Sequence, residues 1–113
     1  AGTVSKRAVS LIDLYPTLAE LASLNSPADL DGESLVPLLK DPDAPRNTPA
    51  MTTRQGRHHA IRTDRWRYIR YADGSEELYD HATGPMEWKN LAGGGTHQAT
   101  QQRLAAQLER LLE

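Results

Sequence analysis

Cationic side chains are concentrated between residues 54 and 71, which contain six arginines and the adjacent pair His58 and His59 but one carboxylate, Asp64. A guanidinium group binds sulfate, phosphate and carboxylate oxygens through two parallel N–H donors, and an imidazole adds a donor or a proton acceptor. The stretch is therefore typical of a wall that receives an anion. It is equally typical of a solvated strand face, because charged residues are mostly exposed. The residue types alone leave both interpretations open.

The rest of the chain does not complete a catalytic site. A hydrolase needs a nucleophile, a base and groups that hold developing charge, and only the histidines offer a base here. The sequence contains no His-x-His, His-Glu-x-x-His or Asp-x-Asp-x-Asp spacing, so it predicts no self-contained metal site. It also contains no cysteine, which excludes a thiolate ligand or nucleophile within these 113 residues. We therefore predict no catalytic residue and no metal ligand in this chain.

The charge is unevenly distributed. The net charge is −2, yet residues 46–71 contain seven arginines and one aspartate. Such asymmetry indicates a local interaction surface rather than a globally basic binder of nucleic acid. No apolar run approaches the roughly 20 residues that span a bilayer. We accordingly expect neither nucleic acid nor membrane among the partners.

The hydrophobic pattern predicts an α+β fold. Period-two alternation from residue 50 onward, with a turn signal at Asp73-Gly74, indicates an antiparallel sheet of about four strands. A helical stripe at the C-terminus predicts a helix that covers one face of this sheet. The expected elements are a helix at 10–24, one helical turn at 34–40, strands at 50–55, 57–63, 65–71 and 76–80, and a helix at 96–113.

The first predicted helix has a strongly apolar face. Ser10 and Asp13 have the spacing of a capping box, and Pro16 either kinks the helix or falls in its first turn. The face is too apolar for a short helix in water, so we expect it to pack against a large partner. The leucines on this face are Leu11, Leu14, Leu18 and Leu21.

Four motifs in order resemble the C-terminal end of type I sulfatases. These are the formylglycine-dependent members of the alkaline-phosphatase-like superfamily, and the resemblance is greatest to the bacterial branch near choline sulfatase and iduronate-2-sulfatase. It extends from about Val4 to the last helix, with Gly84-Pro85 standing where the family has Asp-Pro. The motifs are VSLIDLYPTLAELASL, DLDGESLVPLL, HHAIRTDRWRYIRY and ELYDHATGPMEWKNLA.

The resemblance implies a division of the chain. Residues 1–45 would be the end of a larger α/β catalytic domain plus a connecting loop, and residues 46–113 the smaller C-terminal subdomain. The partner in cis would be the N-terminal catalytic domain, with calcium, formylglycine and the Cys/Ser-x-Pro-x-Arg nucleophile motif. None of these belongs to the present residues, so the chain is expected to be inactive alone. The sequence does not indicate a compartment.

The resemblance also assigns a role to the basic stretch. The subdomain of such sulfatases helps to shape the entrance for an anionic substrate, here a sulfated small molecule or sugar. The candidate ligands are Arg54, Arg57, His58 and His59, beside the turn at Gly56, while Arg62, Arg65, Arg67 and Arg70 are interpreted as an exposed sheet face. Because adjacent strand residues point to opposite faces, one histidine of the pair at most lines a given pocket.

Two hypotheses of other classes remain. The basic strand pair 54–70 could form an independent anion- or RNA-binding module, with Trp66 and Tyr68 stacking on bases. Alternatively, two copies of the chain could form a homodimer through the leucines of the first helix.

Overall fold

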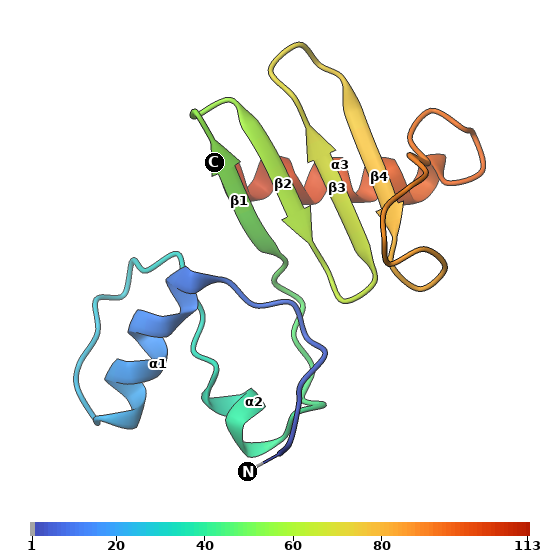
Figure 1. The fold of residues 1–113 in the computed structure, drawn as a ribbon. Helices are drawn as coiled ribbons and strands as arrows, with labels where there is room; N and C mark the ends of the chain where they lie inside the picture. The colour runs from blue at the N-terminus through green and yellow to red at the C-terminus, as the bar shows by residue number, and fades with distance from the viewer. Residues whose placement is uncertain (1) are drawn as a thin grey trace. The chain divides into compact units, whose positions relative to one another are not determined.

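The computed structural model describes residues 2–113, which fall into two compact units divided between Thr48 and Pro49. The first unit contains a 3₁₀ turn at Leu11–Asp13, helix α1 at Leu14–Leu21 and helix α2 at Val36–Lys40. The second contains strands β1 at Ala50–Arg54, β2 at His58–Arg62, β3 at Trp66–Arg70 and β4 at Glu76–Asp80, followed by helix α3 at Gln98–Leu112 (Figure 1). The predicted elements and the α+β fold are therefore confirmed.

The start of α1 follows its sequence signals. The Ser10 backbone N–H donates to Asp13 Oδ2 at 2.7 Å, which is one half of the predicted capping box. Pro16 lies in the first turn of α1, where its missing N–H has no helical partner to lose, so the helix is not interrupted. The helix ends at Leu21, earlier than the pattern predicted.

The interior side of α1 is polar. The Thr17 hydroxyl accepts the Leu35 N–H at 2.8 Å, and the second oxygen of the Asp13 carboxylate accepts the Glu33 N–H at 2.9 Å. Arg46 donates to Asp13 Oδ2 at 2.8 Å, with side-chain exposures of only 5% and 3%. A Cβ on Gly32 would lie 2.1 Å from the backbone carbonyl oxygen of Ile12 in the 3₁₀ turn. Only glycine therefore allows the loop at residue 32 to lie this close to the 3₁₀ turn.

The leucine face of α1 points to solvent within the described residues. The polar residues Asp13 and Thr17 are buried, whereas the leucines predicted to need a partner are not. Amphipathic helices normally bury their apolar face and expose their polar face. The exposed fractions are 84% for Leu11, 49% for Leu14, 63% for Leu18 and 58% for Leu21.

The second unit is a four-stranded antiparallel sheet in the order β1-β2-β3-β4, and α3 lies across one of its faces (Figure 1). Successive strands pair in sequence order, as short hairpins require. Gly74, at a φ of +83°, closes the predicted turn between β3 and β4. His97 immediately precedes α3.

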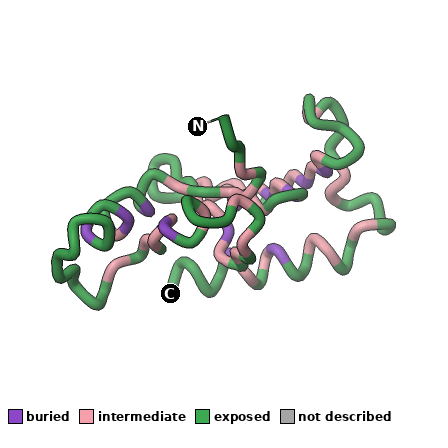
Figure 2. The backbone as a smooth tube through the Cα atoms, turned by 90° about the horizontal axis from the view of Figure 1, so that it is seen from below, coloured by how far each residue is buried: buried purple, intermediate pink, exposed green. Residues whose placement is uncertain are grey.

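The hydrophobic core of this unit lies between the sheet and α3. The buried positions alternate along the strands and recur on one side of the helix (Figure 2). Leu104, Leu108, Leu111 and Leu112 recur at helical spacing, which predicts one apolar stripe. Leu111 and Leu112 nevertheless remain 36% and 39% exposed because the helix extends beyond this core. No helix in residues 2–113 has the length and apolar character that crossing a bilayer demands. The core residues are Ile61, Trp66, Tyr68, Leu78, Leu104 and Leu108.

Candidate functional site

The two candidate histidines occupy opposite faces of β2. His59 belongs to the face that α3 covers, and its Nδ1 lies 3.0 Å from Thr53 Oγ1 on the neighbouring strand. His58 belongs to the other face, which no described helix of residues 49–113 covers, and its ring meets Tyr71 edge-on at 5.7 Å. The alternation expected from the sequence therefore holds, and only His58 directs its ring to the open face.

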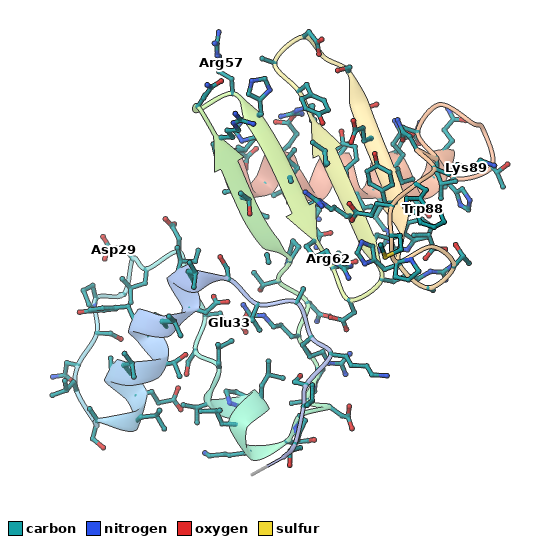
Figure 3. The ribbon with its side chains drawn as sticks, in the orientation of Figure 1. Asp29, Glu33, Arg57, Arg62, Trp88 and Lys89 are labelled. Carbon is teal, nitrogen blue, oxygen red and sulfur yellow. The ribbon has the colours of Figure 1, made fainter. Side chains whose placement is uncertain are left out.

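A shallow hollow of about 230 Å³ lies on the sheet at the ends of β1 and β2. Arg54, His58 and His59 are among its lining residues, so the structure brings three of the four candidates together. The expectation that one histidine of the pair at most lines a given pocket was wrong, because this hollow reaches both residues although they belong to opposite faces of β2. Arg57 is not among them and lies in the β1–β2 turn, at the opposite end of β2 from Arg62 (Figure 3). The rest of the lining comes from Thr52, Ala60, Arg67, Ile69 and Tyr71.

The other four arginines of the basic stretch have partners within the second unit. Arg65 binds Asp80 through two N–H groups at 2.8 and 2.6 Å, Arg67 binds Glu87 at 2.8 Å, Arg70 binds Glu109, and Arg62 meets His81 Nδ1 at 3.0 Å. Their interpretation as a plain exposed sheet face was wrong. Of these four arginines, only Arg65 is exposed, and the other three are half-buried. Arg70 lies two residues after Tyr68 on β3, so it is on the face that the helix covers.

Arg54 and Arg57 differ from these four. Both are exposed, and neither guanidinium has a hydrogen-bond or ion-pair partner among residues 2–113. An unpaired guanidinium keeps its fork of donors free for an incoming anion. The two arginines that the sequence singled out as candidate ligands are therefore the two of the basic stretch without a partner among the described residues.

Tyr71 lines the hollow, and Tyr79 lies on the same face of the sheet. The Tyr71 and Tyr79 hydroxyls donate to the two oxygens of Glu77 at 3.1 and 2.8 Å. Burial and this hydrogen bond raise the pKa of Tyr79 to about 12, and the hydrogen bond to Glu77 raises the pKa of Tyr71. Both phenols therefore stay neutral at physiological pH, and the Glu77 oxygens are already occupied.

The acid that receives Arg65 is strongly biased to its charged form. The hydrogen bonds from Arg65 lower the pKa of Asp80 to about 2, and the Ala82 N–H contributes in the same direction. The hydrogen bond with Asp80 also raises the pKa of Arg65. This pair fixes the end of β4 against the β2–β3 turn.

Several residues around the site were not identified from the sequence. The alternation of the strand does place Tyr71 and Arg67 on the same face, as the period-two pattern indicates, but neither was predicted to adjoin the candidate ligands. His81 and Glu87 lie in the loop after β4 and reach Arg62 and Arg67 across the sheet. Contacts at such sequence separation leave no local signal.

The chain matches a known family over its full length. Residues 1–113 match the family described as N-sulphoglucosamine sulphohydrolase, C-terminal. A protein named Sulfatase from Formosa agariphila is 42% identical over 84 residues, which are 74% of this chain and 17% of that protein.

Two solved structures share the fold. A structure described as a 2-O GAG sulfatase has a TM-score of 0.72 at 29% identity, over 87% of this chain and 23% of the other. A second, described as a complex with its substrate D-glucosamine-2-N,6-O-disulfate, has a TM-score of 0.72 at 25% identity, over 87% and 22%.

The chain belongs to this family of C-terminal sulfatase domains, which confirms the resemblance of its four motifs. It spans about a fifth of the length of these proteins. Sulfatases generally use calcium and formylglycine. The described residues do not fit a calcium centre, because no group of three or more histidine, cysteine or acidic side chains among them is placed to hold a metal ion.

Proposed function

We propose that these residues are the C-terminal part of a sulfuric ester hydrolase and that the second unit shapes the entrance for its anionic substrate. Residues 1–45 form the end of the catalytic domain, and residues 46–113 form the C-terminal subdomain. The catalytic domain in cis supplies the formylglycine nucleophile and calcium. The contribution of the present chain is to bind and orient a substrate that is already negatively charged.

The observation that carries this proposal is the contrast among the arginines. Four of them are engaged with partners within the second unit. Arg54, which lines the hollow with His58, and Arg57, in the adjoining β1–β2 turn, have no such partner among the described residues. A sulfate ester is a permanent anion, and a guanidinium binds its oxygens through two parallel hydrogen bonds. The substrate complex of the second solved structure contains a disulfated sugar, which supports a sulfated saccharide as the substrate class.

Kinetics of the full-length enzyme test the proposal. Arg54→Ala and Arg57→Ala each remove a charge-assisted hydrogen bond to the substrate. Each substitution should therefore lower kcat/KM for a sulfated oligosaccharide by roughly tenfold. The matched control is Arg103→Ala, since Arg103 is an exposed arginine on α3 and belongs neither to the lining of the hollow nor to the β1–β2 turn. The wild-type KM should also rise more steeply with salt than that of either variant. Equal kcat/KM values for the wild type and the Arg54→Ala and Arg57→Ala variants would contradict the proposal.

The chain on its own should have no hydrolase activity. The test is an assay of the purified 113-residue chain against an aryl sulfate with calcium present. Saturable turnover would show that the catalytic machinery does not need the remainder of the parent.

An independent anion- or RNA-binding module is the second candidate, because the hollow is basic. Base stacking has less support, since Trp66 and Tyr68 are only 9% and 0% exposed and belong to the core. Titrations with single-stranded RNA and with a sulfated oligosaccharide across a salt series separate the candidates. Tighter binding of RNA with a steep salt slope would favour the module.

Dimerisation of the isolated chain is a further proposal. The exposed leucines of α1 provide a self-complementary apolar face. Light scattering should give a dimer mass for the wild type and a monomer mass for a Leu14→Glu, Leu18→Glu double variant. A monomeric wild type at the same concentration would exclude this use of the face.

A further inference from the structure

The loop after β4, residues 81–92, presents two large apolar side chains to solvent. Met86 is 68% exposed and Trp88 is 90% exposed, the highest fraction among the large hydrophobic residues that the structure describes. Both lie in the second unit, and Trp88 and its neighbour Lys89 are seen on this loop beside β4 (Figure 3). Exposed apolar side chains gathered on one segment mark interaction sites more often than isolated ones do.

The middle of this Trp88 loop is fixed to the sheet through Glu87. Arg67 Nη1 donates to Glu87 Oε2 at 2.8 Å, and His81 Nε2 lies 2.5 Å from Glu87 Oε1. Glu87 has a φ of +55°, a conformation that is uncommon and costly for a residue with a side chain. The two contacts on its carboxylate anchor the backbone between Met86 and Trp88 to the sheet.

The end of the loop is fixed through Asn90. Its Oδ1 accepts the N–H groups of Leu78 and Ala92, each at 2.9 Å, and its Nδ2 donates to the Glu76 carbonyl oxygen at 3.2 Å. The Leu91 N–H also donates to the Leu78 carbonyl oxygen at 2.8 Å. The apolar side chains are therefore presented from a rigid support, which lowers the entropy cost of docking.

A hollow of about 410 Å³ adjoins the exposed pair. Its wall combines Met86 and Trp88 with apolar parts of β4 and of the loop, and its two acids, Asp80 and Glu87, are both bound to arginines. Lys89 is its one lysine, and no arginine lines it. A surface with so little free positive charge is poorly suited to a sulfated substrate, whereas a large aromatic on a rigid support is typical of the energetic centre of a protein interface.

We propose that the Trp88 loop docks against the part of the parent polypeptide outside residues 1–113. This inference rests on the proposed function, because it requires a larger sulfatase in cis. The relatives indicate where such a partner would come from, because this chain corresponds to only 17–23% of the length of the similar proteins described above. The occupant is an apolar protein surface that buries Trp88 and inserts into the adjoining hollow.

Oxidative footprinting of the full-length parent tests the proposal without reference to activity. Hydroxyl radicals modify Met and Trp side chains according to their exposure, and mass spectrometry assigns the modified residue. In the native parent, Trp88 and Met86 should be oxidised several-fold more slowly than after denaturation in urea, approaching the protection of the core residue Trp66. Oxidation of Trp88 in the native parent at the denatured rate would overturn the proposal. Protection that appears only when a sulfated oligosaccharide is added would overturn it as well, because the occupant would then be the ligand.

A pair of variants gives a second readout. Trp88→Ala should lower the melting temperature of the full-length parent by several degrees, whereas Lys89→Ala, its exposed neighbour, should not. Trp88→Ala removes no contact that holds the loop, because those contacts come from Glu87 and Asn90. Equal melting temperatures for wild type and Trp88→Ala would contradict docking. Equal melting temperatures would not contradict the proposed role in the substrate entrance, because that role is tested separately by the kinetics of the Arg54 and Arg57 variants.

Discussion

Replacing Leu18 by alanine in the full-length parent measures what covers the leucine face of α1. Leu18 is 63% exposed among the described residues, so only about a third of its side chain is buried by this chain. Full burial of a leucine contributes about 1.5–3 kcal/mol. The contacts visible here therefore account for about 0.5–1 kcal/mol of stability. If the catalytic domain covers this face, the substitution instead costs about 2–5 kcal/mol, which is typical of a buried leucine.

Native-state hydrogen exchange is the suitable assay for this substitution. It reports the free energy of opening for the amides of α1 and does not require the large parent to unfold in one step. Alanine has a slightly higher helix propensity than leucine, so any loss reflects packing rather than the helix itself. Glu20→Ala is the matched control, because Glu20 is exposed on the same helix and its replacement should change the opening free energy by less than about 0.5 kcal/mol.

A small effect at Leu18 would refute the reasoning. If Leu18→Ala costs less than about 1 kcal/mol in the parent, the residual burial seen here explains the whole effect. The leucine face would then be in water in the complete protein, and the claim that α1 completes a larger domain would fail.

Two further predictions concern ion pairs. Asp13→Ala should destabilise the parent by about 3–5 kcal/mol, because it leaves the buried guanidinium of Arg46 without its closest partner, and Asp13→Ala combined with Arg46→Met should recover part of the loss in urea unfolding. Asp80→Asn should cost about 1 kcal/mol at pH 7, since Arg65 is half exposed. The pKa of Asp80 is about 2 in the folded protein and about 3.9 in an unfolded chain, so its contribution is complete above pH 4 and disappears as the pH falls towards 2. The stabilities of wild type and Asp80→Asn should converge over that range, and a constant difference would contradict this assignment.

Local patterns were sufficient to predict the secondary structure. The four strands follow from period-two alternation, and the turn at Gly74 follows from the positive φ that Asp-Gly tolerates. The exposed leucine face of α1 was also predictable, because its apolar stripe is too strong for a helix with few neighbours. Such features depend on residues a few positions apart, which the sequence displays directly.

The pairing of the arginines could not be predicted in the same way. Arg65 and Asp80 are 15 residues apart, Arg67 and Glu87 are 20 apart, and Arg70 and Glu109 are 39 apart. Each pair depends on strand register and on where a loop or helix returns to the sheet. The sequence singled out Arg54 and Arg57 by their place beside the turn at Gly56, but only the fold shows that the other four arginines have internal partners.

This distinction has a consequence for how specificity can change. Replacing Arg65, Arg67 or Arg70 leaves an acid without its cation, so such changes carry a cost in stability that selection must offset. Arg54 and Arg57 have no such partner among the described residues, and surface substitutions of this kind change stability by less than about 0.5 kcal/mol. The charge at these two positions can therefore vary with little effect on the fold. Under the proposed function, Arg54 and Arg57 are positions where the binding of a differently sulfated substrate changes independently of stability.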